Sequence, residues 1–300
     1  MASGKMFKHI SIASILLAVL FCFNLQAQNH SEEILEQNRK LYECISKKMD
    51  IRPGLWRPMY ESEQVAWISP PWESDEYIWF DFPEAIQIAG DFIYIGHVSK
   101  RFSSEFPSEK SAPWIEIKDG IRYEQTLPNG ISFAGQITYK GENTAGLELS
   151  VYNGSSNILE EIMLLTCVYL DQIDEFDENT NNNKFVHTPG NKWKSLPDAE
   201  ELEIISDGYS VGWFKESVQV SDLPVVVVKS STEGHLIALT WFEATHAFTG
   251  NPNHPCVHAD PVFHNLKPGQ SQTIQGELIF FEGSIEEFET MFREKLESGK

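Results

Sequence analysis

Short apolar stretches separated by turn-forming residues occupy most of the chain, a pattern typical of β-strands. The stretches are rich in β-branched and aromatic residues and fall at 85–98, 115–121, 130–139, 146–152, 162–170, 223–228, 235–242 and 271–281. Turn dipeptides such as Asp119-Gly120 and Asn129-Gly130 separate several of them. Strands follow strands without helical spacers of about 10 to 15 residues, which argues against a parallel α/β sheet. The pattern predicts a mainly β fold, a large antiparallel β-sandwich.

Two segments have a helical period instead, one near each end of the chain. Apolar residues recur on one helical face of 32–49, before Pro53-Gly54. Ser284 and Glu287 have the spacing of a capping box, and an apolar stripe follows them. The sequence therefore predicts a single β-sandwich domain over 28–300, flanked by an N-terminal and a C-terminal helix.

The first 27 residues have the three parts of a secretory signal peptide. Lys5 and Lys8 precede an apolar stretch over 10–23, and the small residue Ala27 follows. As a helix, the apolar stretch rises only about 21 Å, which is short of the roughly 30 Å hydrocarbon core of a bilayer. We expect cleavage after Ala27, a periplasmic or extracellular location, and no stable membrane insertion of the mature chain.

The charge balance narrows the choice of partner. Lys and Arg total 23 against 44 Asp and Glu, a formal net charge of -21. Such a charge repels phosphate backbones, so we expect no nucleic-acid binding. The hydrophobic fraction of 41% and the aromatic fraction of 12% are enough for a sizeable core. The sequence therefore indicates an acidic globular protein.

The cysteines do not form a disulfide framework. Cys22 leaves with the signal peptide, so Cys44, Cys167 and Cys256 remain, an odd number with wide spacing. Cys167 lies in an apolar stretch and is expected to be a buried small hydrophobe. One bridge among the three is compatible with an oxidising compartment, and the sequence leaves its pairing open.

The segment 241–264 concentrates residues that carry chemistry. It contains His246, His254, His258 and His264 together with Glu243, Cys256 and Asp260. In an extended strand, His254, Cys256, His258 and Asp260 would all point to the same face. Thiolate, imidazole and carboxylate groups bind divalent transition metals, so one hypothesis is a metal cofactor held by these four residues. Pro255 and Pro261 disturb a regular strand and weigh against it.

A second hypothesis gives residues of this segment a role in proton transfer. Histidine titrates near neutral pH, and a neighbouring carboxylate fixes its tautomer. His258 with Asp260, and His246 with Glu243, are the predicted catalytic pairs. A third interpretation is structural, with these side chains bonding the backbone of an irregular loop. The sequence leaves the three open.

Aromatic residues and a long polar loop indicate where a ligand binds. An exposed indole stacks on a sugar ring, and Trp72 and Trp241 are expected to be exposed because each borders a turn-rich or His-rich loop. His97 and His187 are expected to join them in a concave substrate-binding site. The polar stretch 171–191 is predicted to be a surface loop, either a binding loop or a tolerated insertion.

Several segments resemble known proteins. They are TLPNGISFAGQI, LELSVYNGS, WFEATHAF, HPCVHADP and LKPGQSQTIQGELIFFEGS. Together they resemble a group of secreted proteins of environmental bacteria, a resemblance that implies no activity by itself. The last segment and the NGS turn are also similar in style to galactose-mutarotase-like sandwich domains of sugar epimerases and polysaccharide-degrading enzymes. That resemblance implies a supersandwich-like fold and a carbohydrate ligand, but the order of residues departs from the epimerase pattern, so no mechanism is carried over.

The leading hypothesis is a secreted carbohydrate-binding and carbohydrate-active protein with proton transfer by His, Asp and Glu. Whether the reaction would be an epimerisation, a lyase reaction or a hydrolysis stays open. The alternatives are a non-catalytic glycan-binding or structural module and a metal-binding β-sandwich protein.

Overall fold

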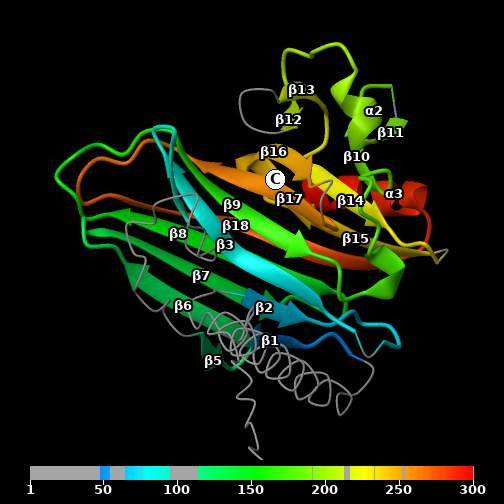
Figure 1. The fold of residues 1–300 in the computed structure, drawn as a ribbon, viewed down its shortest axis with the longest axis horizontal. Coiled ribbons are helices and arrows are strands. Elements are labelled where there is room, and N and C mark those ends of the chain that lie inside the picture. Colours follow the sequence, from blue (N-terminus) through cyan, green and yellow to red (C-terminus); the bar gives the residue numbers. More distant parts are fainter. Residues whose placement is uncertain are drawn as a thin grey trace, which may run out of the picture.

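The computed structural model describes residues 48–54, 65–74, 76–94, 114–190, 192–212, 217–232, 234–251 and 254–299. Within these residues the chain forms two large sheets, each of nine strands, with only two α-helices (Figure 1). The prediction of a mainly β, antiparallel sandwich is confirmed. The predicted signal peptide and almost all of the predicted N-terminal helix lie outside the described residues.

Sheet A contains the strands that build the candidate site. Its order is β1 (Ile51–Gly54), β2 (Val65–Ile68), β3 (Ile78–Ile88), β9 (Ile162–Tyr169), β17 (Cys256–Phe263), β16 (Thr245–Gly250), β12 (Tyr209–Val211) and β13 (Val218–Ser221). The strand β4 (Asp91–Tyr94) pairs with β3. Among these described strands the pairings are antiparallel, except that β12 runs parallel to β16. The strands β9 and β17 therefore lie in the middle of the sheet.

Sheet B forms the other layer. Its order is β11 (Lys192–Ser195), β10 (Lys184–Thr188), β14 (Val225–Lys229), β15 (His235–Thr240), β18 (Ser271–Glu282), β8 (Thr144–Asn153), β7 (Ile131–Tyr139), β6 (Gly120–Thr126) and β5 (Ile115–Ile117). The short helix α2 (Leu196–Glu200) follows β11 directly. Figure 1 shows β3, β9 and β17 of sheet A lying over β18, β8 and β7 of sheet B.

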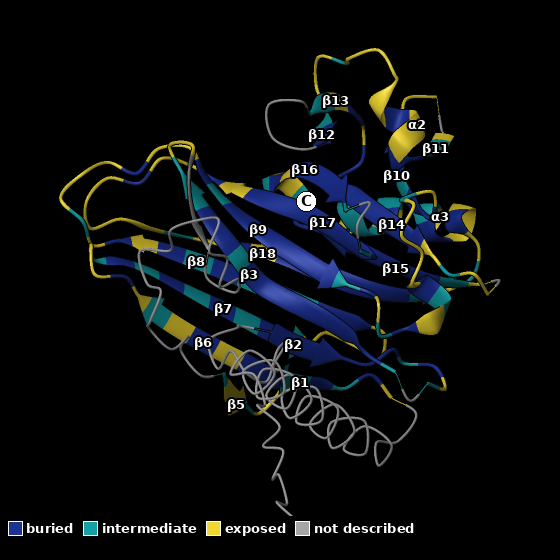
Figure 2. Cartoon of the chain, in the orientation of Figure 1, coloured by how far each residue is buried: buried dark blue, intermediate teal, exposed yellow. Residues whose placement is uncertain are grey.

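The main core lies between the sheets because alternate residues of both point inward. It contains residues of sheet A such as Phe80 and Val168 and residues of sheet B such as Leu149 and Phe280. In Figure 2 the sandwich strands are mostly buried, and exposed residues gather in the connections and on the edge strands. The period-two patterns of the sequence thus correspond to inward and outward faces.

The outer face of sheet B is covered by the predicted C-terminal helix, α3 (Ile285–Ser298). Phe288 and Phe292 of the helix pack against a second cluster that includes Val225 and Ala238. The capping box is present, since both of its reciprocal hydrogen bonds form at the start of the helix. In the described part of the chain, no helix is both long and apolar enough to span a membrane.

Two sequence expectations on single elements are wrong. The stretch 85–98 is not one strand, because a turn at Ala89 and Gly90, both with positive φ, separates β3 from β4. The predicted loop 171–191 contains β10 at its C-terminal end. A local turn divides the first stretch into two strands. In the second stretch, five residues form a strand that pairs with β11 and β14.

Candidate functional site

Strand β17 places three of the predicted site residues on one face of sheet A. Its alternate residues Val257 and Ala259 belong to the main core, and Cys256, His258 and Asp260 point to the opposite face. They are nevertheless buried, with exposed fractions of 0% for Cys256, 2% for His258 and 4% for Asp260. The outer face of this central strand is therefore polar and shielded from water.

Cys167 completes this group from the neighbouring strand β9. It lies opposite His258 in the antiparallel register. The thiols of Cys167 and Cys256 and a ring nitrogen of His258 all lie within 4.8 Å of one another. These three residues are called the Cys/His cluster below. The sequence marked Cys167 as a buried hydrophobe and gave no sign that β9 pairs with β17.

Carboxylates surround the imidazole of this cluster. Asp260 Oδ1 lies 3.5 Å from His258 Nδ1, and Glu84 Oε2 lies 3.9 Å from Nε2. Asp260 Oδ1 also accepts a hydrogen bond of 3.0 Å from the backbone N–H of Thr166, which fixes its orientation. Asp81 is buried on β3, directly opposite Cys167 in the register. The nearby carboxylates favour a positive charge at this position, on the imidazole of His258 or on a bound cation.

The thiols and the imidazole shift one another's protonation. The hydrogen bond from Cys167 and the charge of His258 hold the pKa of Cys256 well below its usual value. The same hydrogen bond, together with burial, raises the pKa of Cys167. Burial lowers the pKa of His258, but Cys256 and Asp260 outweigh it and raise that pKa well above its ordinary value. The group can hold a thiolate, which is the form that binds metals and attacks electrophiles.

His254 borders the Cys/His cluster without belonging to it. It is half-buried just before β17 and is not among the groups within 4.8 Å of one another. Its Nε2 pairs with Asn251 Nδ2 at 2.9 Å. Its Nδ1 is buried and has no hydrogen-bond partner within the described part of the chain. His254 also helps to lower the pKa of Cys256, as a smaller cause after Cys167 and the charge of His258.

The second predicted catalytic pair lies elsewhere. Glu243 belongs to the 3-10 turn η3 (Phe242–Ala244), and His246 lies at an irregular position of β16. Both side chains are exposed. Neither joins the Cys/His cluster, and His264 is exposed at the far end of β17.

The expectation that Trp72 and Trp241 are exposed is wrong. Trp241 is 1% exposed and stacks on Phe82 in the main core, with ring centroids 5.9 Å apart. Trp72 is 9% exposed and stacks on His235 at 4.1 Å. Both indoles belong to the main core, so a position next to a loop in the sequence does not make either of them exposed. His97 lies outside the described residues.

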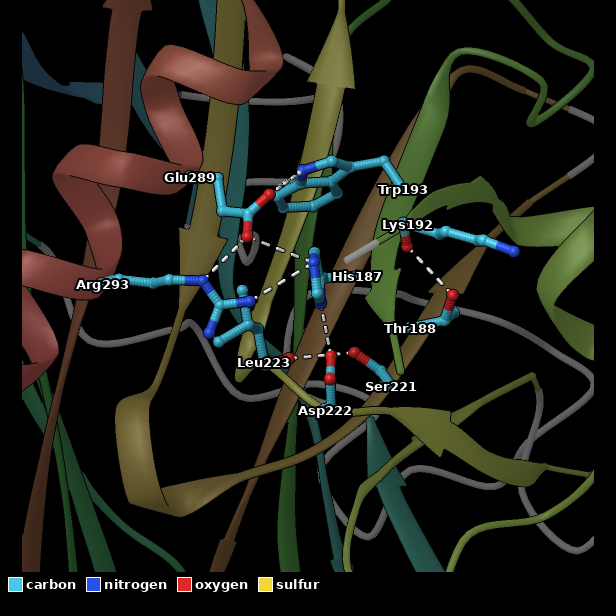
Figure 3. Close-up of polar contacts among 9 residues, drawn as sticks. All are labelled: His187, Thr188, Lys192, Trp193, Ser221, Asp222, Leu223, Glu289 and Arg293. Atoms are coloured by element: carbon cyan, nitrogen blue, oxygen red, sulfur yellow. Dashed lines mark hydrogen bonds and ion pairs between the residues drawn. The ribbon is translucent and has the colours of Figure 1, made fainter. Parts of the chain in front are cut away.

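His187 is buried on the other sheet, in the network of Figure 3. Its Nδ1 lies 2.5 Å from Asp222 Oδ1, and its Nε2 lies 3.3 Å from Glu289 Oε1 and 3.3 Å from Arg293 Nη2. Trp193 Nε1 donates to Glu289 Oε2 at 3.1 Å. These groups come from β10, β11, the residue after β13, and α3. The network joins the C-terminal helix to the edge of sheet B, and His187 does not meet the Cys/His cluster.

A pocket opens beside the long polar connection between β9 and β10. Its volume is about 240 Å³, and polar side chains dominate its lining: Glu175, Asp177, Glu178, Asn182, Asn183, Phe185, Lys229, Ser230 and Ser231. We call it the acidic pocket. The sequence identified this connection as a candidate binding loop but did not indicate which of its residues face a cavity.

The wall of the acidic pocket is held in place by hydrogen bonds. The carboxylate of Glu175 accepts from Trp72 Nε1 at 2.9 Å and pairs with His235 Nδ1 at 2.8 Å. The backbone oxygen of Glu175 accepts from the N–H of Ser231 at 2.7 Å. Phe176, beside it in η1 (Asp174–Phe176), is fully buried. The loop is therefore anchored to the turn between β14 and β15.

The sequence matches no protein-family model and no curated protein. Among solved structures, the chain is distantly similar to a GalM/aldose epimerase homologue from C. elegans, with 10% identity, 67% of this chain and 79% of that chain covered, and a TM-score of 0.36. It is also similar to galactose 1-epimerase from Lactobacillus acidophilus NCFM, with 11% identity, coverages of 80% and 100%, and a TM-score of 0.33. Both scores are low, so the function has to be argued from the chain's own residues.

Proposed function

We propose that the protein is a secreted carbohydrate-binding protein that holds a sugar in the acidic pocket. The observation that carries this proposal is the lining of a 240 Å³ pocket by carboxylates, amides, hydroxyls, one ammonium and one aromatic ring. A pocket of this size is smaller than the roughly 300–1,000 Å³ of typical drug-sized sites, and it suits a single sugar ring.

The chemistry of the lining matches a polyhydroxylated ligand. Each sugar hydroxyl both donates and accepts a hydrogen bond. The carboxylates of the pocket accept, the ammonium of Lys229 donates, and the amides of Asn182 and Asn183 do both. Lys229 Nζ lies 5.4 Å from the ring centroid of Phe185, which helps to hold the only aromatic side chain of this lining in place. Aromatic rings pack against the apolar face of a sugar.

The charges of the pocket select among sugars. Three of the lining residues, Glu175, Asp177 and Glu178, carry a carboxylate, and one, Lys229, carries an ammonium. This balance repels uronic acids and phosphorylated sugars and favours neutral sugars or amino sugars. The anchoring of Glu175 by Trp72 and His235 limits the ordering that binding requires.

The proposal is for binding. The predicted proton-transfer groups His246, His258, Asp260 and Glu243 are not part of the pocket lining. The predicted proton transfer therefore finds no support in this pocket, and the glycan-binding alternative is the one that its geometry favours.

Calorimetric titration of the mature chain with neutral, amino and uronic sugars tests the proposal. A neutral or amino sugar is expected to bind and a uronic acid is not. Asp177→Asn is expected to weaken binding about tenfold, since a hydrogen bond to a charged group contributes about 1.5–3 kcal/mol and the amide keeps one acceptor. Asp119→Asn, in the exposed turn between β5 and β6, is the matched control and should bind like the wild type. Absence of sugar binding, or an equal affinity in Asp177→Asn, contradicts the proposal.

Secretion rests on the signal-peptide features of residues 1–27, which lie outside the described residues. Expression in a bacterial host with an intact secretory pathway tests it, with the N-terminus of the exported protein determined by mass spectrometry. A mature chain that begins at Gln28 is expected. Retention of Met1 or Ala2 in a cytoplasmic product contradicts secretion.

A further inference from the structure

We propose that Cys167, Cys256 and His258 bind a transition metal ion, with Zn²⁺ the best fit and His254 as the fourth ligand. This centre is separate from the sugar pocket, because none of its residues lines that pocket. It differs from the metal set expected from the sequence, because Cys167 enters from β9 and Asp260 takes a supporting position.

The distances suit a tetrahedral centre. With metal–sulfur bonds of about 2.3 Å and metal–nitrogen bonds of about 2.0–2.1 Å, ligand atoms around zinc lie roughly 3.4–3.8 Å apart. The three donor atoms of the Cys/His cluster already lie within 4.8 Å of one another. At most about 1.4 Å of closure is needed, a change that side-chain rotation can supply. The two strands that carry them are paired in the middle of sheet A, so the backbone is fixed before a metal arrives.

The order of residues on β17 brings the donors together. Alternate residues of a strand are about 6.6 Å apart, too far for three short side chains to meet. Here a short thiol, Cys256, lies between two longer imidazoles, His254 and His258, which can lean toward it from either side. Cys167 approaches from across the pairing with β9, opposite His258. Donor atoms therefore reach the same position from two strands, as a tetrahedral ligand set requires.

His254 supplies an independent observation. Its Nδ1 is buried and lacks a hydrogen-bond partner among the described residues, an arrangement that is unfavourable unless another group fills the position. Its Nε2 lies 2.9 Å from Asn251 Nδ2, an amide donor, so Nε2 accepts in this pairing and Nδ1 carries the proton. A metal at Nδ1 therefore requires the amide of Asn251 to flip, so that its oxygen accepts from Nε2–H. His254 lies outside the group of atoms within 4.8 Å, so it completes the centre only by moving toward Cys256.

The charges and the burial also favour a metal. Two thiolates and two neutral imidazoles around a divalent ion have no net charge, which suits a site with almost no exposure to water. Soft thiolates with imidazoles select zinc over magnesium or calcium. Asp260 Oδ1 lies 3.5 Å from His258 Nδ1, and Glu84 Oε2 lies 3.9 Å from Nε2, so a carboxylate is near the second ring nitrogen whichever one binds the metal. Such carboxylates orient metal-bound histidines.

A titration of the metal-free, reduced mature chain with Zn²⁺, in competition with a chromophoric chelator, measures the affinity. One equivalent is expected to bind, and Co²⁺ in its place is expected to give the thiolate-to-cobalt absorption band. Cys167→Ser and His258→Gln are expected to lose at least 100-fold in affinity, and Asp260→Asn about 10–100-fold. His254→Ala is expected to lose affinity but to retain the cobalt–thiolate band. His264→Ala, an exposed histidine near the end of the same segment, is the control and should bind like the wild type.

If a variant at a buried position fails to fold, metal binding by the wild-type chain still tests the proposal. Absence of zinc binding by the folded wild type, or a cobalt complex without the thiolate band, overturns the proposal. Unchanged zinc affinity in a folded Cys167→Ser also overturns it. Rapid formation of a Cys167–Cys256 disulfide that zinc does not slow overturns it as well, because a metal would protect these thiols. Sugar titration of the same variants is expected to be unaffected, so failure of either proposal is visible separately.

Discussion

Two buried histidines of this sandwich, His187 and His258, have different surroundings and therefore different roles. His187 is surrounded by protein partners at both ring nitrogens, with Asp222 on one side and Glu289 and Arg293 on the other. These contacts satisfy both ring nitrogens, so we interpret His187 as a joint between α3 and sheet B. His258 instead lies against two thiols. The partners, and not the residue type, separate a structural imidazole from a candidate ligand.

Glu289 in the His187 network gives a pH-dependent prediction. Burial raises its pKa, but the hydrogen bond from Arg293 and the charge of His187 outweigh burial, so the net pKa lies below the ordinary 4.5. A lowered folded-state pKa contributes stability that is present above the ordinary value and is lost as the pH falls through the folded one. Glu289→Gln is therefore expected to lower the free energy of unfolding by about 1 kcal/mol at neutral pH and by less at about pH 3.

Urea unfolding at the two pH values measures this difference. Glu294→Gln, an exposed position on the same helix, is the control and should change little at either pH. An effect of Glu289→Gln that is the same at both pH values would show that the charge of Glu289 does not stabilise the fold.

At the level of strands and helices, the sequence predicts those features that depend on the spacing of residues close together in the chain. The capping box at Ser284 and the alternation of Cys256, His258 and Asp260 are both present, because neighbours along the chain determine them. Cys167 could not be connected to this group, since its pairing with His258 joins positions 91 residues apart (258 minus 167) and depends on the order of strands in sheet A. The order of strands is a property of the whole sheet, and no short segment of the sequence determines it.

The candidate pocket shows the same division. A polar connection between two apolar strands predicted a surface loop near 171–191, and the loop does line the acidic pocket. The other wall comes from Lys229, the last residue of β14, and from Ser230 and Ser231, which follow it. Their contact with the loop arises because β10 and β14 are neighbours in sheet B. The sequence thus predicted the loop, with a binding role and a tolerated insertion both left open, but it did not predict the cavity.

For the molecule as a whole, Trp241 tests whether the two sheets share one core. It follows β15 of sheet B, stacks on Phe82 of β3 in sheet A, and is 1% exposed. A Cβ at Gly276 would lie 2.7 Å from Cε3 of the indole, so the neighbouring strand β18 has no room for a larger residue there. Trp241→Ala is expected to lower the free energy of unfolding by about 3–5 kcal/mol, because the cavity opens between both sheets. Urea unfolding measures this, and Trp241→Phe should lose less of the free energy of unfolding.

Since Trp241 does not line the acidic pocket, the sugar affinity of the folded variant is expected to stay unchanged. A variant of wild-type stability that no longer binds sugar would instead return Trp241 to the substrate-binding role expected from the sequence and would show that the indole does not hold the sheets together.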